Sequence, residues 1–394
     1  MAQWTRNLLL AGGAMVVGLL VCELVLRLLG VSYPVYVWTD PVRGVAHIPG
    51  ATGGPRQPDG HRRIEINGDG MRGPDIALKH PPGTFRIALL GDSFIEAFEV
   101  PFEQTVGEVL QRRLSTIRGA PVEVLNFGVG GYGTAQELLT LQHEVWKYAP
   151  DLILLAVTTG NDISNNYRPL DGGDYRPYYV PVDGRLVLDR SFTKSKAYRS
   201  RAVWTKRLLG LVQESRLVQL VNRVRHSGRK TERQRDNAGA IPGEEVGLRD
   251  EVQLPPTTPE WQAAWRVTEG ILLLMRDECR SRRTPFAIVT LTRGIQVNPD
   301  PGKKAEFLRQ LGAKDLYYPE RRLNTFGERM GLPTFNLAPP MAKEAEQRRI
   351  YFHGSGDGLG TGHWNERGHR AAGELIAPWL AAEVSGRPNP KSPL

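Results

Sequence analysis

Apolar runs alternate with helically spaced segments from residue 85 onward in this chain of 394 residues. The runs are short and continuous, which is typical of strands in a parallel sheet that helices cover on both faces. We therefore predict an α/β domain. The expected strands are 85–90, 122–126, 151–157, 286–291 and 334–337, and the expected helices are 105–114, 134–148, 261–280, 321–330 and 366–384.

The alternation breaks for about a hundred residues after Asn161, which is too long for a plain connection. We expect an insertion at about 163–258 within a domain that covers 85–390. Residues 31–84 are rich in Gly and Pro and predict an irregular, β-rich lead-in. The insertion contains a predicted basic amphipathic helix with apolar residues at three- to four-residue steps, namely Trp204, Leu208, Leu211, Val218 and Val221.

The first thirty residues predict a membrane anchor. Residues 8–22 are all apolar or Gly, and the run resumes after Glu23, so one helix is long enough to cross a bilayer. Glu23 and Arg27 lie four residues apart and are expected to pair near the interface. Small residues for signal cleavage are missing around Val21 and Cys22, which favours an uncleaved signal-anchor over a signal peptide or a buried helix. Arg6 favours a short cytoplasmic tail, with a single-pass chain whose bulk is extracytoplasmic.

The composition excludes a disordered or a fibrous protein. With 40% hydrophobic and 24% charged residues the chain is an ordinary globular protein, and its two cysteines define no disulfide framework. The net charge of +9 is concentrated between Lys194 and Arg235, so we expect no nucleic-acid partner. The basic helix there is either a solvated face, a contact with anionic membrane, or a lid over the site.

Polar and Gly-rich loops follow the first three strands, where the carboxyl ends of parallel strands form ligand sites. They are GDSF at 91–94, NFGVGGYG at 126–133 and TGND at 159–162. Ser93 lies on the first turn, and the backbone N–H groups of Ser93 and Gly131 with the amide of Asn161 are candidate oxyanion donors. Ordinary turns and a helix cap at Asn161 are the alternatives.

A late histidine precedes the last predicted helix, in the segment HGSGDGLGTGHWNERGH at 353–369. His363 is placed to reach a serine at the edge of the sheet, whereas His369 is expected to be structural. Metal binding by His353, Asp357, His363 and His369 is an alternative, although the spacing matches no known helical ligand pattern.

Together GDSF, NFGVGG, GNDI and GHWNERGH resemble, in order and setting, the four blocks of SGNH (GDSL-type) hydrolases. This resemblance implies a flavodoxin-like three-layer α/β/α fold and an acyl-enzyme mechanism without a cofactor. It implies Ser93 as nucleophile, His363 as general base, and Ser93, Gly131 and Asn161 as the oxyanion hole.

One position departs from the family pattern. The family's acid commonly stands three residues before the histidine, where this chain has Gly360. Asp357 is the nearest acid upstream and is predicted to complete the triad. A Ser–His dyad steadied by a backbone carbonyl is the alternative.

The sequence thus predicts a membrane-anchored serine esterase that hydrolyses carboxylic esters, with short acyl groups. An acylated glycan or a lipid is the expected substrate. O-acylation of an envelope polysaccharide through the same site, and a non-catalytic carbohydrate-binding relative, are the alternatives.

Overall fold

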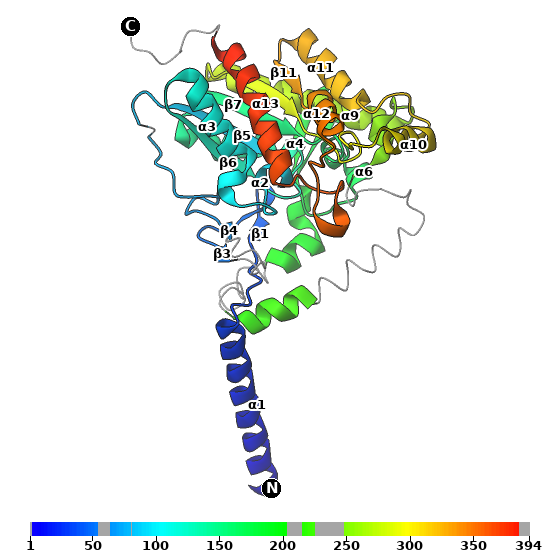
Figure 1. The fold of residues 1–394 in the computed structure, drawn as a ribbon. Coiled ribbons are helices and arrows are strands. Elements are labelled where there is room, and N and C mark those ends of the chain that lie inside the picture. Colours follow the sequence, from blue (N-terminus) through cyan, green and yellow to red (C-terminus); the bar gives the residue numbers. More distant parts are fainter. Residues whose placement is uncertain (1, 54–63, 80, 203–214, 225–247, 386–394) are drawn as a thin grey trace.

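The computed structural model describes residues 2–53, 64–79, 81–202, 215–224 and 248–385. Helix α1 (Ala2–Leu28) stands away from the rest of the protein (Figure 1). Its segment Gln3–Leu28 is long and apolar enough to cross a membrane, with a mean hydropathy of 2.4, a property that signal sequences share. The expected pair forms on α1, since Arg27 Nε donates to Glu23 Oε1 over 2.8 Å.

A five-stranded parallel sheet forms the centre of the α/β domain, in the order β11-β10-β7-β5-β6. Counted along the chain this is the order 2-1-3-4-5, which is the flavodoxin-like topology. The predicted three-layer α/β fold is therefore confirmed. The strands are β5 (Phe85–Gly91), β6 (Val122–Gly128), β7 (Leu152–Val157), β10 (Phe286–Thr290) and β11 (Thr334–Asn336).

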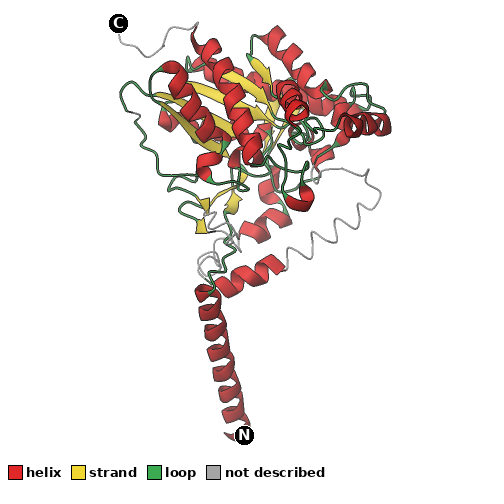
Figure 2. Ribbon diagram, viewed as in Figure 1, coloured by secondary structure: helices red, strands yellow, loops and turns green. Residues whose placement is uncertain are grey.

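Helices cover both faces of this sheet (Figures 1 and 2). Every residue of β7 is buried, because apolar side chains on both faces of the strand pack against helices. One core contains α3 (Val106–Arg118), α12 (Ala338–Arg348) and α13 (Glu366–Ser385). The other contains α4 (Thr134–His143), α9 (Pro259–Ser281) and α11 (Tyr318–Met330).

The lead-in forms two small antiparallel pairs beside the domain. They are β1 (Val37–Asp40) with β2 (Gly44–His47), and β3 (Thr52–Gly53) with β4 (Ile64–Glu65). In the predicted insertion the hairpin of β8 (Tyr178–Val182) and β9 (Arg185–Asp189) contacts α9, and residues 216–224 are helical. Trp204, Leu208 and Leu211 of the predicted amphipathic helix lie outside the described residues.

Shorter elements connect the main ones. The predicted helix at 134–148 ends early, because α4 stops at His143 and a 3-10 turn follows. The remaining elements are α2 (Ser93–Glu96), η1 (Phe102–Gln104), η2 (Val145–Tyr148), α5 (Asp162–Asn165), α6 (Arg168–Asp171), η3 (Ser191–Lys194), η4 (Asp250–Gln253), α10 (Pro301–Leu311) and η5 (Gly356–Gly358).

Candidate active site

Ser93 is the first residue of α2, directly after the central strand β5. Asp92 caps this short helix, because its carboxylate accepts the N–H of Phe94 over 3.0 Å. A side chain at Gly91 would meet Ile95 at 2.4 Å, so the tight turn requires glycine. The turn brings Ser93 Oγ to 2.7 Å from His363 Nε2. The serine and the histidine that the sequence singles out are therefore in hydrogen-bond contact.

The acid beside this histidine is Glu99, which the sequence reading missed. His363 Nδ1 lies 2.8 Å from Glu99 Oε1, so the two ring nitrogens contact a carboxylate and a hydroxyl. The expectation that Asp357 fills this role is wrong in this structure. Asp357 is exposed on η5. Glu99, and not Asp357, contacts Nδ1 of His363.

The charge of Glu99 changes the basicity of the imidazole. Burial opposes the charged form of His363, but the hydrogen bond and the charge of Glu99 outweigh burial and raise the His363 pKa above its ordinary value. The same contact lowers the pKa of Glu99 despite partial burial. Both side chains remain about two-fifths exposed, at 37% and 43%, so solvent screens part of this interaction.

Gly131 and Asn161 lie in the loops after β6 and β7, as expected. Gly131 is exposed with φ at +78°, and a Cβ added there would meet nothing within 4 Å. Asn161 does not act as a side-chain cap of α5. Its Nδ2 donates to Asp92 Oδ2 over 3.0 Å, which uses one of the two amide hydrogens. The second hydrogen of that amide is available to a substrate oxygen.

His353 supports the loop that carries His363. Its Nδ1 lies 2.6 Å from the carbonyl of Gly362, so Nδ1 carries the proton and Nε2 accepts the hydroxyl of Thr292 over 2.8 Å. Thr292 in turn accepts the indole N–H of Trp364 over 2.7 Å. Burial lowers the pKa of His353 to about 4, so the ring is neutral at pH 7. This network fixes both neighbours of His363 in the chain.

His369 is structural, as the sequence predicts. It is buried in α13, and its Nδ1 accepts the N–H of Val106 at the start of α3 over 3.3 Å. Burial lowers its pKa to about 3. In the described part of the chain, no three His, Cys, Asp or Glu residues form a group suited to a metal ion.

The lead-in contributes two buried residues that contact the site loops. His47 Nε2 lies 2.7 Å from Glu96 Oε1, and the same oxygen accepts the N–H of Gly130 over 3.0 Å. Glu96 therefore joins α2 to the loop that carries Gly131. Arg72 donates to the carbonyls of Glu96, Ala97 and Val100, which flank Glu99 on either side. The lead-in thus holds both site loops.

Three buried carboxyl groups lie beside the loops that carry Ser93, Gly131 and Asn161. Asp92, Glu137 and Asp162 are fully buried, and burial raises the pKa of each above its ordinary value. The charges of neighbouring carboxyls raise those of Glu137 and Asp162 further. Among the described residues neither Glu137 oxygen has a hydrogen-bond partner, so burial favours the protonated form of this side chain.

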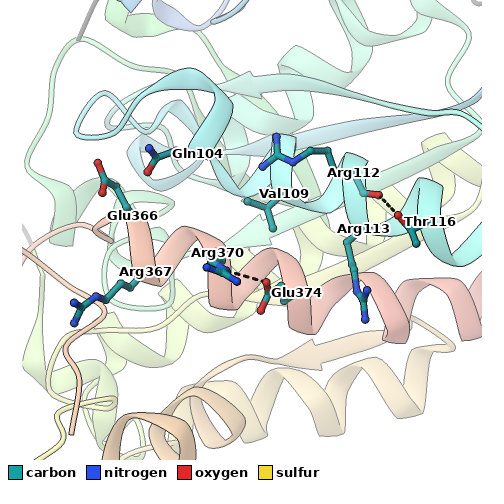
Figure 3. A pocket seen from close by; sticks show the side chains of 9 residues that line it. All are labelled: Gln104, Val109, Arg112, Arg113, Thr116, Glu366, Arg367, Arg370 and Glu374. Atoms are coloured by element: carbon teal, nitrogen blue, oxygen red, sulfur yellow. Dashed lines mark hydrogen bonds and ion pairs between the residues drawn. The ribbon is translucent and has the colours of Figure 1, made fainter. Parts of the chain in front are cut away.

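A separate groove of about 590 Å³ opens between α3 and α13 (Figure 3). It contains none of the candidate site residues. Charged side chains project from both helices, and Arg370 pairs with Glu374 across one turn of α13. Its lining is Gln104, Val109, Arg112, Arg113, Thr116, Glu366, Arg367, Arg370 and Glu374.

Comparison with known families agrees with this geometry. Residues 87–185 match the family model described as GDSL-like Lipase/Acylhydrolase, and this range includes Ser93, Gly131 and Asn161. Over this range the chain matches the SGNH hydrolase superfamily, to which GDSL-like acylhydrolases belong. It is therefore a serine hydrolase. No curated protein sequence matches this hydrolase.

Solved structures similar to this hydrolase share little sequence with it. A lipase/acylhydrolase from Enterococcus faecalis is 14% identical, with a TM-score of 0.35, covering 78% of this chain and 100% of that one. A GDSL-like lipase from Bacteroides thetaiotaomicron is 10% identical, with a TM-score of 0.34, covering 76% and 89%. A catalytic mutant of an acetylxylan esterase from Geobacillus stearothermophilus is 11% identical, with a TM-score of 0.37, covering 78% and 97%.

Proposed function

We propose that this serine hydrolase cleaves carboxylic esters through an acyl-enzyme on Ser93. The observation that carries the proposal is the unbroken line from Glu99 through His363 to Ser93, with contacts of 2.8 Å and 2.7 Å. A serine hydroxyl is a weak nucleophile alone and is activated by a neighbouring base that a third group orients.

In the first half of the reaction His363 Nε2 takes the proton of Ser93 as Oγ attacks the ester carbonyl carbon. Glu99 holds the proton on Nδ1, which leaves Nε2 free to accept, and it stabilises the imidazolium that forms. The tetrahedral oxyanion accepts hydrogen bonds from the N–H groups of Ser93 and Gly131 and from the second Asn161 hydrogen. Imidazolium then protonates the departing alcohol.

In the second half a water molecule attacks the acyl-enzyme. His363 takes the proton of the water, and collapse of the second tetrahedral species returns that proton to Ser93 and releases the carboxylic acid. Glu99 takes the role of the acid that the family commonly has at the chain position of Gly360. This removes the reason for expecting a non-catalytic relative.

Fluorophosphonate labelling of the full-length protein tests the proposal. We expect labelling of Ser93, and hydrolysis of short-chain aryl esters, both lost in Ser93→Ala. Ser281→Ala is the matched control, because that serine is exposed on α9 and distant in sequence from every site residue. Hydrolysis that survives in Ser93→Ala would rule out the proposed nucleophile. Hydrolysis and acyl transfer are distinguished by supplying an acylated glycan together with an acceptor sugar. A hydrolase releases the free acid, whereas an acyltransferase produces the acylated acceptor.

We further propose that α1 is retained as a single span that anchors the enzyme, with the catalytic domain on the extracytoplasmic side. The length and apolar character of Gln3–Leu28 support a span, and Arg6 near its start supports this orientation. Carbonate extraction tests anchoring, and protease treatment of spheroplasts tests the side. Release of the full chain by carbonate would contradict anchoring by α1. Protection of the domain from protease would contradict its extracytoplasmic location.

A further inference from the structure

The described helix at residues 216–224 turns valines outward. Val218, Val221 and Val224 are 36%, 49% and 64% exposed, and their three-residue spacing places them along one side of the helix. The opposite side faces the protein, where Gln219 is buried. A helix on a water-facing surface ordinarily presents polar side chains outward. This helix exposes three valines beside Arg223, so its outer face offers apolar area to a neighbour.

The last turns of α1 hold this helix in place. Glu23 of α1 accepts hydrogen bonds from the N–H groups of Arg216 and Leu217, each over 2.9 Å, and from Ser215 Oγ over 3.0 Å. These are the unpaired donors of a helix N-terminus, so a carboxylate of α1 caps the second helix. The helix lies crosswise to the end of α1, beneath the catalytic domain (Figure 1).

Three further contacts attach the inner side of the helix to the segment that follows α1. Gln219 Oε1 accepts the N–H of Tyr33 over 2.8 Å, and Arg216 donates to Ser32. The guanidinium of Arg223 lies 4.3 Å from the centre of the Tyr33 ring. The orientation of the valines is therefore fixed relative to α1.

We propose that the face formed by Val218, Val221 and Val224 lies in the interfacial layer of the bilayer that α1 crosses. The inference rests on the proposed anchoring by α1. We take lipid as the neighbour of this face, because the cap at Glu23 places the helix beside the last turns of the apolar span, which ends at Leu28. The surrounding segment 194–235 is strongly basic, which suits anionic headgroups.

A second membrane contact has a consequence for catalysis. One spanning helix leaves an attached domain free to turn about its link, whereas two crossed helices in one bilayer hold the domain in a single orientation. The direction in which Ser93 faces an ester on or near the membrane is then set by these two helices.

Site-specific fluorescence of the full-length enzyme in nanodiscs tests this inference. In a Cys22→Ala background, where the remaining Cys279 is buried, an environment-sensitive nitrobenzoxadiazole probe is attached to Val221→Cys. Val17→Cys in α1 reports on the span, and Ile117→Cys, an exposed aliphatic residue of α3, is the water-facing control. Nanodiscs contain phosphatidylglycerol with or without a lipid nitroxide-labelled near the headgroup, and iodide serves as the aqueous quencher.

We expect the nitroxide lipid to remove most of the emission at position 221 and iodide to quench it little, with the opposite result at position 117. Quenching by lipid at 17 together with full iodide access at 221 would overturn this inference and leave the anchor intact. Lack of lipid quenching at 17 would overturn the anchor and this inference together. Shielding of position 221 from both quenchers would show that protein covers the valines and would also overturn it. Fluorophosphonate labelling of the same samples tests the hydrolase assignment independently.

Discussion

Glu99 reaches His363 from the same segment that carries Ser93, with 2.8 Å between Glu99 Oε1 and His363 Nδ1. The chain bends back after α2 at Ala97, whose φ of +56° lies in the left-handed region. Arg72 donates to the carbonyl of Ala97 and to those of Glu96 and Val100. A buried side chain of the lead-in therefore holds the bend that directs the acid toward the histidine.

Replacing Glu99 tests its role as the orienting acid. We expect Glu99→Gln to lower kcat by about 10²-fold, because the imidazolium loses its stabilising charge. Since Glu99 raises the pKa of His363, and only the neutral ring acts as base, the acid limb of kcat/KM should move to lower pH in the variant. Asp357→Asn is the matched control and should leave rate and pH profile unchanged. Equal effects of the two substitutions would contradict the assignment.

The amide of Asn161 is expected to act only when charge develops on the substrate oxygen. Asn161→Ala should therefore reduce kcat by about 10²-fold with little change in KM. Asn165→Ala removes an amide from α5, the short helix that follows Asn161, and serves as the control. Steady-state kinetics with an aryl ester measure both parameters. A rise in KM at constant kcat would place Asn161 in substrate binding instead.

Arg72 is expected to position Glu99 without contacting substrate. Arg72→Met should lower the free energy of unfolding by roughly 2–3 kcal/mol, since the carbonyls of Glu96, Ala97 and Val100 lose their charged donor. It should also move the acid limb of the rate profile in the same direction as Glu99→Gln, a result that simple destabilisation does not produce. Arg72→Lys should recover part of the effect, and Arg112→Met, at an exposed arginine, should change neither property.

The buried carboxyl of Glu137 makes stability depend on pH. Burial, followed by the charge of Asp92, raises its folded pKa, while the unfolded side chain loses its proton near pH 4.5. The folded state therefore binds more protons above that pH, and stability falls as pH rises toward the folded pKa. Glu137→Gln removes this term and should raise Tm at pH 8 by about 2 °C or more. Thermal melts from pH 4 to 9 should show no such gain for the exposed Glu374→Gln.

Sequence patterns predict the sheet, and they single out Ser93 and His363, which the structure brings into contact. The oxyanion roles of Gly131 and Asn161 stay predictions. The strands are buried on both faces, so their apolar runs are continuous and unambiguous. In a parallel sheet the carboxyl ends of the strands lie at one edge, so the loops that follow neighbouring strands lie close together. Strand-end motifs therefore predict contacts between residues that are far apart in the chain.

The sequence does not predict Glu99 as the acid, because this residue does not directly follow a strand. Its position depends on the bend at Ala97, a residue type that carries no signal for a left-handed conformation. One signal was present: three glutamates follow Ser93 closely in the chain, namely Glu96 in α2, Glu99, and Glu103 in η1. Gly360 stands at the position where the usual acid is expected. His47 and Arg72 could not be found, since contacts of an irregular lead-in follow no periodic pattern.

The shared origin of Ser93 and Glu99 alters how the active enzyme is completed during folding. Both groups are carried by β5 and the turn after it, which Arg72 of the lead-in holds, so all of these parts precede the histidine in the chain. A single late encounter, the arrival of the loop from Phe352 to Trp364, then joins the base to both partners at once. We expect the nascent chain to stay inert until its final helix leaves the ribosome, so esterase activity would be a direct readout of completed folding.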